Sequence, residues 1–259
     1  MHIDLKGKVA IVTGGGRGIG RVIAETLAGE GVSTIVTDIR QDLLDAVTGE
    51  WEEQGWPGAQ LLADVRSRDD CRAVAAAVER DFGRIDILVN NAGVASGARV
   101  EQLSEEVWDA NLDTNLKGTM LMCQAVIPAM QRRKAGRIIN ASSFAAIIPS
   151  IGGAAYASSK AGVESLTRVL ASELGPSGIT VNCYAPGMIP TEMNRYAEAP
   201  PERQEQLLDT LTLRRWGDPR DIANLVCFLA SDLAGYITGA MIDISGGKFA
   251  TQMPWMAHR

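Results

Sequence analysis

Histidine is scarce in this chain of 259 residues, with only His2 and His258 near the two ends. Zinc sites usually take histidine or clustered cysteine ligands. A Ser-His-Asp hydrolase needs a histidine as its base. We therefore expect neither a metal site built by the protein nor a hydrolase of that kind.

Cysteine is also sparse, and the copies are far apart in the sequence. Cys71, Cys123, Cys183 and Cys227 form no Cys-x-x-Cys pair, and each lies within an apolar segment. Free, mostly buried thiols in a reducing compartment are the simplest interpretation.

An excess of basic residues and a long apolar run are lacking too. The formal net charge is −6 and the isoelectric point is about 5.1, whereas a nucleic-acid-binding protein usually carries a basic face. No run reaches the roughly 18 apolar residues of a membrane span, and the N-terminus has no long apolar segment typical of a signal peptide. We expect a cytoplasmic protein that binds neither nucleic acid nor a membrane.

What is present is an alternation of short apolar strands with helical patterns, in a chain that is 46% hydrophobic. Strands are predicted at 9–12, 34–37, 60–63, 85–89, 137–140, 179–183 and 241–244. Helices are predicted at 19–27, 43–51, 71–82, 105–112, 116–132, 155–174 and 219–229. This order predicts an α/β fold over residues 1–259: a single-domain, Rossmann-type doubly wound sheet of seven mostly parallel strands with helices on both faces.

Two segments stand outside this alternation. A polar, proline-marked insertion predicts a substrate lid at about 190–213, above the carboxyl ends of the strands. A C-terminal tail at 248–259 contains the apolar run Met253-Pro254-Trp255-Met256. It is either a contact with a neighbouring subunit or a frayed end.

A glycine-rich turn joins the first strand to the first helix. Gly14, Gly18 and Gly20 allow a tight turn and let a pyrophosphate approach the backbone amides of the helix N-terminus, next to Arg17 and Ile19. The turn therefore predicts a dinucleotide site.

Asp38 follows the second strand, where a carboxylate can accept hydrogen bonds from an adenosine ribose and repel a 2′-phosphate. Arg17 and Arg40 lie nearby in sequence and would favour NADP. Repulsion between the Asp38 carboxylate and a 2′-phosphate should outweigh the attraction of that phosphate to a mobile arginine. We therefore expect NAD in preference to NADP.

Tyr156 and Lys160 are four residues apart on a predicted helix, and Ser143 lies thirteen residues upstream. Residues at i and i+4 share a helix face. A nearby positive charge lowers the pKa of a phenol, which would let Tyr156 exchange a proton with an alcohol or a ketone. The pair alone is a weak signal, because it recurs by chance.

Taken together, the motifs resemble the short-chain dehydrogenase/reductase family from Lys8 to Gly247. The matching elements are Thr13-Gly14-x-x-x-Gly18-x-Gly20, Asp64-Val65, Asn90-Asn91-Ala92-Gly93, Asn115, Ser143, Tyr156-x-x-x-Lys160, and Pro186-Gly187 with Thr191.

This resemblance implies the role of each site residue. Tyr156 exchanges the proton, Ser143 orients the substrate oxygen, Lys160 binds the nicotinamide ribose and lowers the pKa of Tyr156, and Asn115 holds a water through a distorted helix. The implied cofactor-binding residues are Gly14, Arg17, Gly18, Ile19, Gly20, Asp38, Asp64, Val65, Asn91, Gly93, Tyr156, Lys160, Pro186, Gly187, Ile189 and Thr191. A homotetramer is implied as well.

Three positions complicate the match. Ser142 competes with Ser143, and Asn111 competes with Asn115, but the spacing favours Ser143 and Asn115 in each case. Ser245 stands where the family often has an acidic residue before two glycines, which alters a local turn or a subunit contact.

The substrate pocket is expected to contain Ser96, Phe144, Ile151, Met188 and Met193. Because most of these side chains are apolar, we expect an NAD(H)-dependent oxidoreductase that interconverts a secondary alcohol and a ketone. Three alternatives remain: a sugar or polyol dehydrogenase, an NADPH-dependent 3-oxoacyl-carrier-protein reductase, and an idle nucleotide-sensing scaffold. For the carrier, Lys134 and Arg137 supply positive charge, while Ser177 stands where an arginine would help.

Overall fold

In the computed structural model, which describes residues 3–194 and 196–258, the chain folds around a seven-stranded sheet. The strands are β1 Val9–Thr13, β2 Ser33–Asp38, β3 Gly58–Leu62, β4 Ile87–Asn90, β5 Gly136–Ala141, β6 Ile179–Pro186 and β7 Met241–Ile244. Their order is β3-β2-β1-β4-β5-β6-β7, and every neighbouring pair is parallel. The predicted doubly wound sheet is confirmed, and it is parallel throughout.

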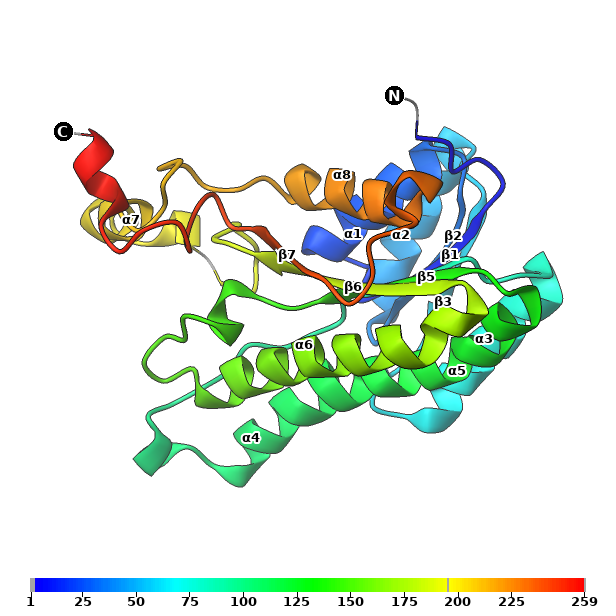
Figure 1. Cartoon of the computed structure of the whole chain (residues 1–259), viewed down its shortest axis with the longest axis horizontal. Helices are drawn as coiled ribbons and strands as arrows, with labels where there is room; N and C mark the ends of the chain where they lie inside the picture. The colour runs from blue at the N-terminus through cyan, green and yellow to red at the C-terminus, as the bar shows by residue number, and fades with distance from the viewer. Residues whose placement is uncertain (1–2, 195, 259) are drawn as a thin grey trace.

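Helices cover both faces of this sheet (Figure 1). They are α1 Gly18–Gly29, α2 Gln41–Gln54, α3 Arg68–Phe82, α4 Glu105–Asn111, α5 Gly118–Arg133, α6 Ala154–Leu174, α7 Pro201–Leu208 and α8 Pro219–Ala230. Leu27, Trp51 and Val226 belong to the core on the face covered by α1, α2 and α8. Val78, Val126 and Leu174 belong to the core on the face covered by α3, α5 and α6.

The structure differs from the predicted helices in two places. The helix expected at 116–132 is continuous with α4 through a π-helical turn, Leu112–Lys117, so α4, this turn and α5 form one distorted helix. The expected polar insertion contains α7, which begins at Pro201, a first-turn position that tolerates proline because no backbone N–H is needed there.

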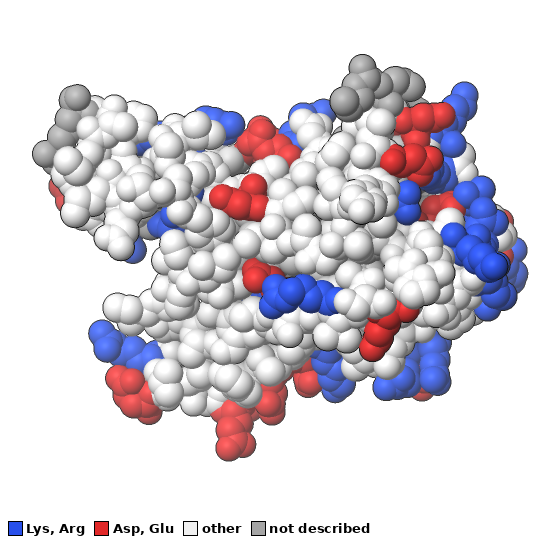
Figure 2. Space-filling model, viewed as in Figure 1, with Lys and Arg blue, Asp and Glu red and all other residues white. Residues whose placement is uncertain are grey.

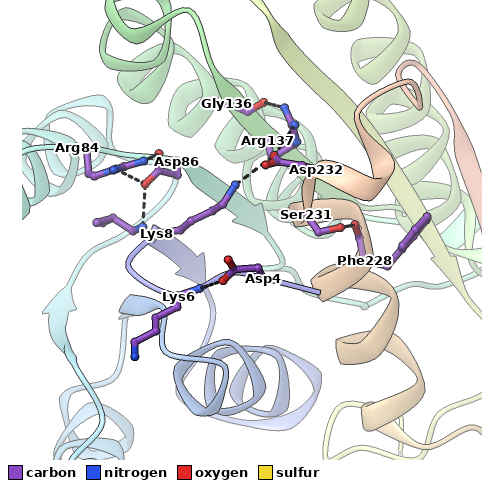
Figure 3. A network of polar contacts seen from close by, with 11 residues as sticks. Asp4, Lys6, Lys8, Arg84, Asp86, Gly136, Arg137, Phe228, Ser231 and Asp232 are labelled. Atoms are coloured by element: carbon purple, nitrogen blue, oxygen red, sulfur yellow. Dashed lines mark hydrogen bonds and ion pairs between the residues drawn. The ribbon is translucent and has the colours of Figure 1, made fainter. Parts of the chain in front are cut away.

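A buried ion pair lies at the amino ends of β1 and β4 (Figure 3). Asp86 is 7% exposed. Its carboxylate accepts a hydrogen bond of 2.9 Å from the Val9 amide and two of 2.6 Å from the Arg84 guanidinium. The carboxylate of Asp86 raises the pKa of Arg84. This end of the sheet is therefore closed by groups that satisfy one another.

A second, more exposed network lies at the same end of the sheet. Lys8 and Arg137 both contact the carboxylate of Asp232, at 3.3 Å and 3.2 Å (Figure 3). Lys134 and Arg137 flank the amino end of β5, so within one chain they lie at the end of the sheet opposite to Ser143 and Tyr156. Neither basic residue lies beside the predicted catalytic groups of its own chain.

Across residues 3–194 and 196–258, none of the helices combines the length and the apolar character that a bilayer span requires.

Candidate active site

The glycine-rich turn packs against the carboxyl end of β4. Gly14 has φ +62° and Gly18 has φ +57°, a backbone region that side chains other than glycine rarely adopt. A Cβ atom on Gly14 would lie 2.8 Å from Cα of Ala92, and one on Gly20 would lie 2.3 Å from the Gly14 oxygen. Glycine at these positions therefore lets the turn pack tightly against β4 at the amino end of α1, where backbone amides can bind a phosphate.

Asn91 and Thr13 fasten this turn to the sheet. The side-chain nitrogen of Asn91 donates to the carbonyl oxygens of Thr13 and Gly14, at 3.2 Å each. The Thr13 hydroxyl accepts from the amides of Asn91 and Ala92, at 3.1 Å each. Asn91 therefore holds the turn in shape.

Asp38 lies directly against the turn. Its two carboxylate oxygens accept hydrogen bonds of 3.2 Å from the amides of Gly16 and Arg40. The two arginines that would favour NADP are engaged elsewhere: Arg17 contacts Glu192 at 2.8 Å, and Arg40 contacts Asp42. Asp38 therefore places a negative charge beside the turn.

Asp64 and Val65 follow β3 at the same edge. The Arg66 guanidinium bonds to the Asp64 carboxylate and lowers its pKa. Val65 is buried, and a Cβ atom on Gly118 would lie 2.7 Å from its side chain. Val65 thus packs against the helix that contains Asn115.

Asn115 lies in the π-helical turn, so its helix is distorted as predicted. Its side chain accepts a hydrogen bond of 2.8 Å from the Val94 amide and donates to the Ser159 hydroxyl at 2.9 Å. A Cβ atom on Gly93 would lie 3.0 Å from the side-chain oxygen of Asn115 and 3.6 Å from Nζ of Lys160. The strand-end glycine thus lets the asparagine and the lysine approach each other.

Asn111 faces a different loop, because its side chain donates to the carbonyl oxygen and the hydroxyl of Ser96, at 3.1 Å each. Ser96, expected in the substrate pocket, is therefore tied to the helix that precedes Asn115.

The Ser143 side chain lies near the Tyr156 phenol. The Ser143 hydroxyl lowers the pKa of the phenol, but burial raises that pKa more strongly. The Ser142 hydroxyl donates to the carboxylate of Glu164 at 2.8 Å instead. Ser143 is therefore the serine that reaches the tyrosine.

Lys160 is 4% exposed, and no carboxylate within the described ranges pairs with it. Its ammonium donates to the Ala141 carbonyl at 2.8 Å and lies 5.7 Å from the centre of the Tyr156 ring. Burial lowers the pKa of Lys160 to about 8. Burial of the phenol dominates the pKa of Tyr156 in this arrangement. The expected lowering of that pKa by Lys160 stays a prediction.

The segment after β6 brings Thr191 towards the glycine turn. A Cβ atom on Gly187 would lie 2.5 Å from the Ser245 carbonyl oxygen, and one on Gly18 would lie 3.9 Å from the Thr191 methyl group. Asn194 fixes this segment by donating to the Ile189 carbonyl at 2.8 Å. Thr191 thus lies across from the dinucleotide turn.

The expected pocket residues are only partly brought together. Phe144 and Met188 join Leu211 in an apolar cluster. Ile151 is 86% exposed and Met193 is 52% exposed. Figure 2 shows a largely uncharged hollow between the α7 region and the rest of the molecule.

Sequence reasoning missed several residues around this cluster: Tyr196, Trp216, Lys248 and Phe249, besides Leu211 itself. The rings of Tyr196 and Trp216 stack at 5.9 Å, with 8° between their planes. Two aromatic rings that flank a polar insertion were the available signal. Among the described ranges, no three histidine, cysteine or acidic side chains gather as metal ligands would.

A family model described as enoyl-(acyl carrier protein) reductase matches residues 14–248. The chain belongs to the short-chain dehydrogenase/reductase family. The protein is accordingly an NAD(P)-dependent oxidoreductase that acts on CH–OH groups. The tightly packed glycine turn at the amino end of α1 has the chemistry to hold the pyrophosphate of such a cofactor through its backbone amides.

The protein is similar to several known relatives. It is 40% identical over 245 residues to the 3-oxoacyl-(acyl-carrier-protein) reductase of Thermotoga maritima, which covers 94% of this chain and 98% of the relative. A putative short-chain alcohol dehydrogenase from Sinorhizobium meliloti superposes with a TM-score of 0.91 at 36% identity, covering 96% and 99% of the two chains. A gluconate 5-dehydrogenase from Burkholderia cenocepacia, in complex with NADP and tartrate, has a TM-score of 0.91 at 29% identity, covering 96% and 98%.

Proposed function

We propose that this protein is an NAD(H)-dependent oxidoreductase that interconverts a secondary alcohol and a ketone. One observation carries the proposal: the Ser143 hydroxyl lies near enough to the Tyr156 phenol to lower its pKa, and the buried ammonium of Lys160 lies 5.7 Å from the same ring. Phe144, next in sequence to Ser143, extends this polar group into an apolar cluster. Such a site suits a carbonyl oxygen on an apolar body.

Each polar side chain has a distinct role in this mechanism. Ser143 holds the substrate oxygen through a hydrogen bond, and Tyr156 donates a proton to that oxygen in reduction and accepts it in oxidation. Lys160 stabilises negative charge on the phenol, and Asn115 fixes the neighbouring backbone at Val94. The cofactor, when bound, supplies or accepts the hydride.

The preference for NAD rests on Asp38. Its carboxylate lies against the glycine turn, and Arg17 and Arg40 are paired with acidic residues. A 2′-phosphate would meet the carboxylate without a free guanidinium to offset it. The other cofactor-binding roles assigned from sequence stay predictions.

Reduction of a 3-oxoacyl group on a carrier protein with NADPH is the second candidate. It is favoured by relatives of that name at 40–42% identity over nearly the whole chain. Against it stand Asp38 and the position of Lys134 and Arg137, at the other end of the sheet from Tyr156. Polyol oxidation is less favoured, because the cluster around Phe144 has few hydrogen-bonding groups.

We also propose that segment 190–213 closes over the substrate. Glu192 is paired with Arg17 of the glycine turn, and Leu211 packs in the cluster with Phe144, so the segment touches both halves of the site. The cytoplasmic location and the homotetramer stay predictions, and light scattering of the purified protein tests the tetramer.

A substrate panel with both cofactors tests the proposal. Cyclic and linear ketones, 3-oxoacyl thioesters and polyols are assayed with NAD(H) and NADP(H), for the native protein and for Tyr156→Phe. We expect kcat/KM to be higher with NAD(H), and Tyr156→Phe to lose about 10²- to 10⁴-fold in kcat, the usual contribution of a general acid or base. Wild-type turnover by Tyr156→Phe would overturn the mechanism, and a preference for NADPH with 3-oxoacyl thioesters would establish the second candidate.

A further inference from the structure

Lys248, which has no acidic partner among the described residues, lies against the aromatic residue that follows Ser143 in the sequence. Nζ of Lys248 is 5.6 Å from the centre of the ring of Phe144, which follows Ser143 directly. Lys248 is half-buried, and burial lowers its pKa. No carboxylate within residues 3–194 and 196–258 pairs with its ammonium.

The backbone holds this lysine in place from two sides. The Lys248 amide donates to the Ser245 hydroxyl at 2.9 Å, which closes the turn through Gly246 and Gly247, both with positive φ. The same turn is bonded to the end of segment 190–213, because the amide of Leu213 donates to the Gly246 carbonyl at 3.0 Å and the Thr212 hydroxyl donates to the Gly247 carbonyl at 2.9 Å. Ser245, which stands where the family often has an acidic residue, thus positions Lys248 by accepting its backbone hydrogen bond.

The surroundings make this cation a poor structural choice. The cluster near it consists of Phe144, Met188, Leu211 and partly buried aromatic residues. Even partial removal of an ammonium from water into apolar surroundings is unfavourable unless an anion compensates it. The cation–π contact with Phe144 offsets only part of the desolvation cost of the ammonium.

We propose that Lys248 binds a carboxylate of the substrate, so that the site selects keto acids and hydroxy acids over neutral ketones and alcohols. This inference rests on the proposed function and narrows its substrate class. The aromatic and aliphatic cluster contacts the carbon chain, and Lys248 contacts the acidic end. Because Phe144 adjoins Ser143 in sequence, we expect the carboxylate to lie a few bonds from the reacting carbon.

Binding of matched ligand pairs tests the inference independently of turnover. The probes are linear keto acids with the ketone two to five carbons from the carboxyl carbon, each beside its methyl ester, titrated calorimetrically in the presence of NAD⁺, which cannot reduce a ketone. We expect at least one acid to bind more tightly than its ester. Lys248→Met should weaken that acid about 10- to 100-fold and the ester little, as for the loss of a charge-assisted hydrogen bond.

Lys248→Arg keeps the charge, and we expect it to retain most of the preference for the acid. Lys6→Met, which removes an exposed cation at the opposite end of the sheet, is the matched control and should change nothing. Equal binding of acids and esters by the native protein, or equal weakening of both by Lys248→Met, would overturn the inference. If the inference about Lys248 fails, the proposed function would still stand provided that the protein reduces esters or neutral ketones with NADH and that this activity requires Tyr156.

Discussion

The two ends of the parallel sheet treat buried charge in opposite ways. At the amino end, Asp86 is satisfied by Arg84 and the Val9 amide. At the carboxyl end, the ammonium of Lys160 contacts the Ala141 carbonyl and the Tyr156 ring, and that of half-buried Lys248 contacts the Phe144 ring. Neither lysine has a carboxylate partner among the described residues. The first arrangement stabilises the fold, whereas the second leaves positive charge available to ligands. The contrast distinguishes charged residues that stabilise the fold from charged residues that we expect to bind ligands.

The largest effect is expected at Lys160, where function and stability should move in opposite directions. We expect Lys160→Met to lower kcat/KM by about 10²- to 10³-fold, as when a preorganised charge is removed from an active site. Its folded-state pKa of about 8 lies below its ordinary value of 10.5. The unfolded chain therefore binds more protons between these values, and stability rises as the pH increases from about 8 to 10.5.

The same variant should consequently be more stable than the native protein at pH 7, by up to about 3 kcal/mol. This gain should shrink as the pH approaches 10.5. Denaturant unfolding at pH 7 and pH 10 measures it, and Lys117→Met, at an exposed lysine paired with Asp113, is the control. A loss of stability at pH 7 equal to that at pH 10 would contradict the low pKa.

Asp86 provides the opposite case at the amino end. We expect Asp86→Ala to lower the free energy of unfolding by about 2–4 kcal/mol, since it leaves the Val9 amide and the Arg84 guanidinium without their buried partner. Asp86→Asn keeps an acceptor for the amide and should lose less. Because Asp86 lies far from the site, kcat/KM of the folded protein should stay unchanged. A comparable loss of kcat/KM would show that the two ends of the sheet are coupled.

The smallest effect is expected at Asp232. Its side chain is 83% exposed although it contacts both Lys8 and Arg137. Solvent screens such pairs, so Asp232→Ala should change the free energy of unfolding by less than about 1 kcal/mol. Thermal unfolding at low and high salt measures this change. A loss of stability as large as that of Asp86→Ala would mean that the exposure of a side chain does not predict the strength of its ion pairs at this edge of the sheet.

The sequence predicted the fold because its signals are local. Short β-branched runs such as 9–12 and the glycine turn at 14–20 predict strands and their junctions without long-range information. The meeting of Ser143 with Tyr156 was also predictable, since the spacing of the family motifs encodes it.

The aromatic cluster and Lys248 were not predictable, because segments far apart in the sequence build them. Tyr196 and Trp216 come from either side of α7, and Lys248 follows the last strand. The direction of the Tyr156 pKa shift also depends on where the ammonium of Lys160 points, which a motif does not specify. Burial and side-chain direction are properties of the packed molecule.

The turn after β7 also has a practical consequence for handling the protein. The His258 ring lies 2.9 Å from the Thr212 carbonyl oxygen, and the Thr212 hydroxyl bonds to the Gly247 carbonyl, so the tail up to His258 is held against the turn after β7. A purification tag fused behind this tail would therefore strain the contact between His258 and Thr212. Tags for kinetic work belong at the amino terminus, and a fluorophore at the carboxyl terminus would serve as a reporter of ligand entry.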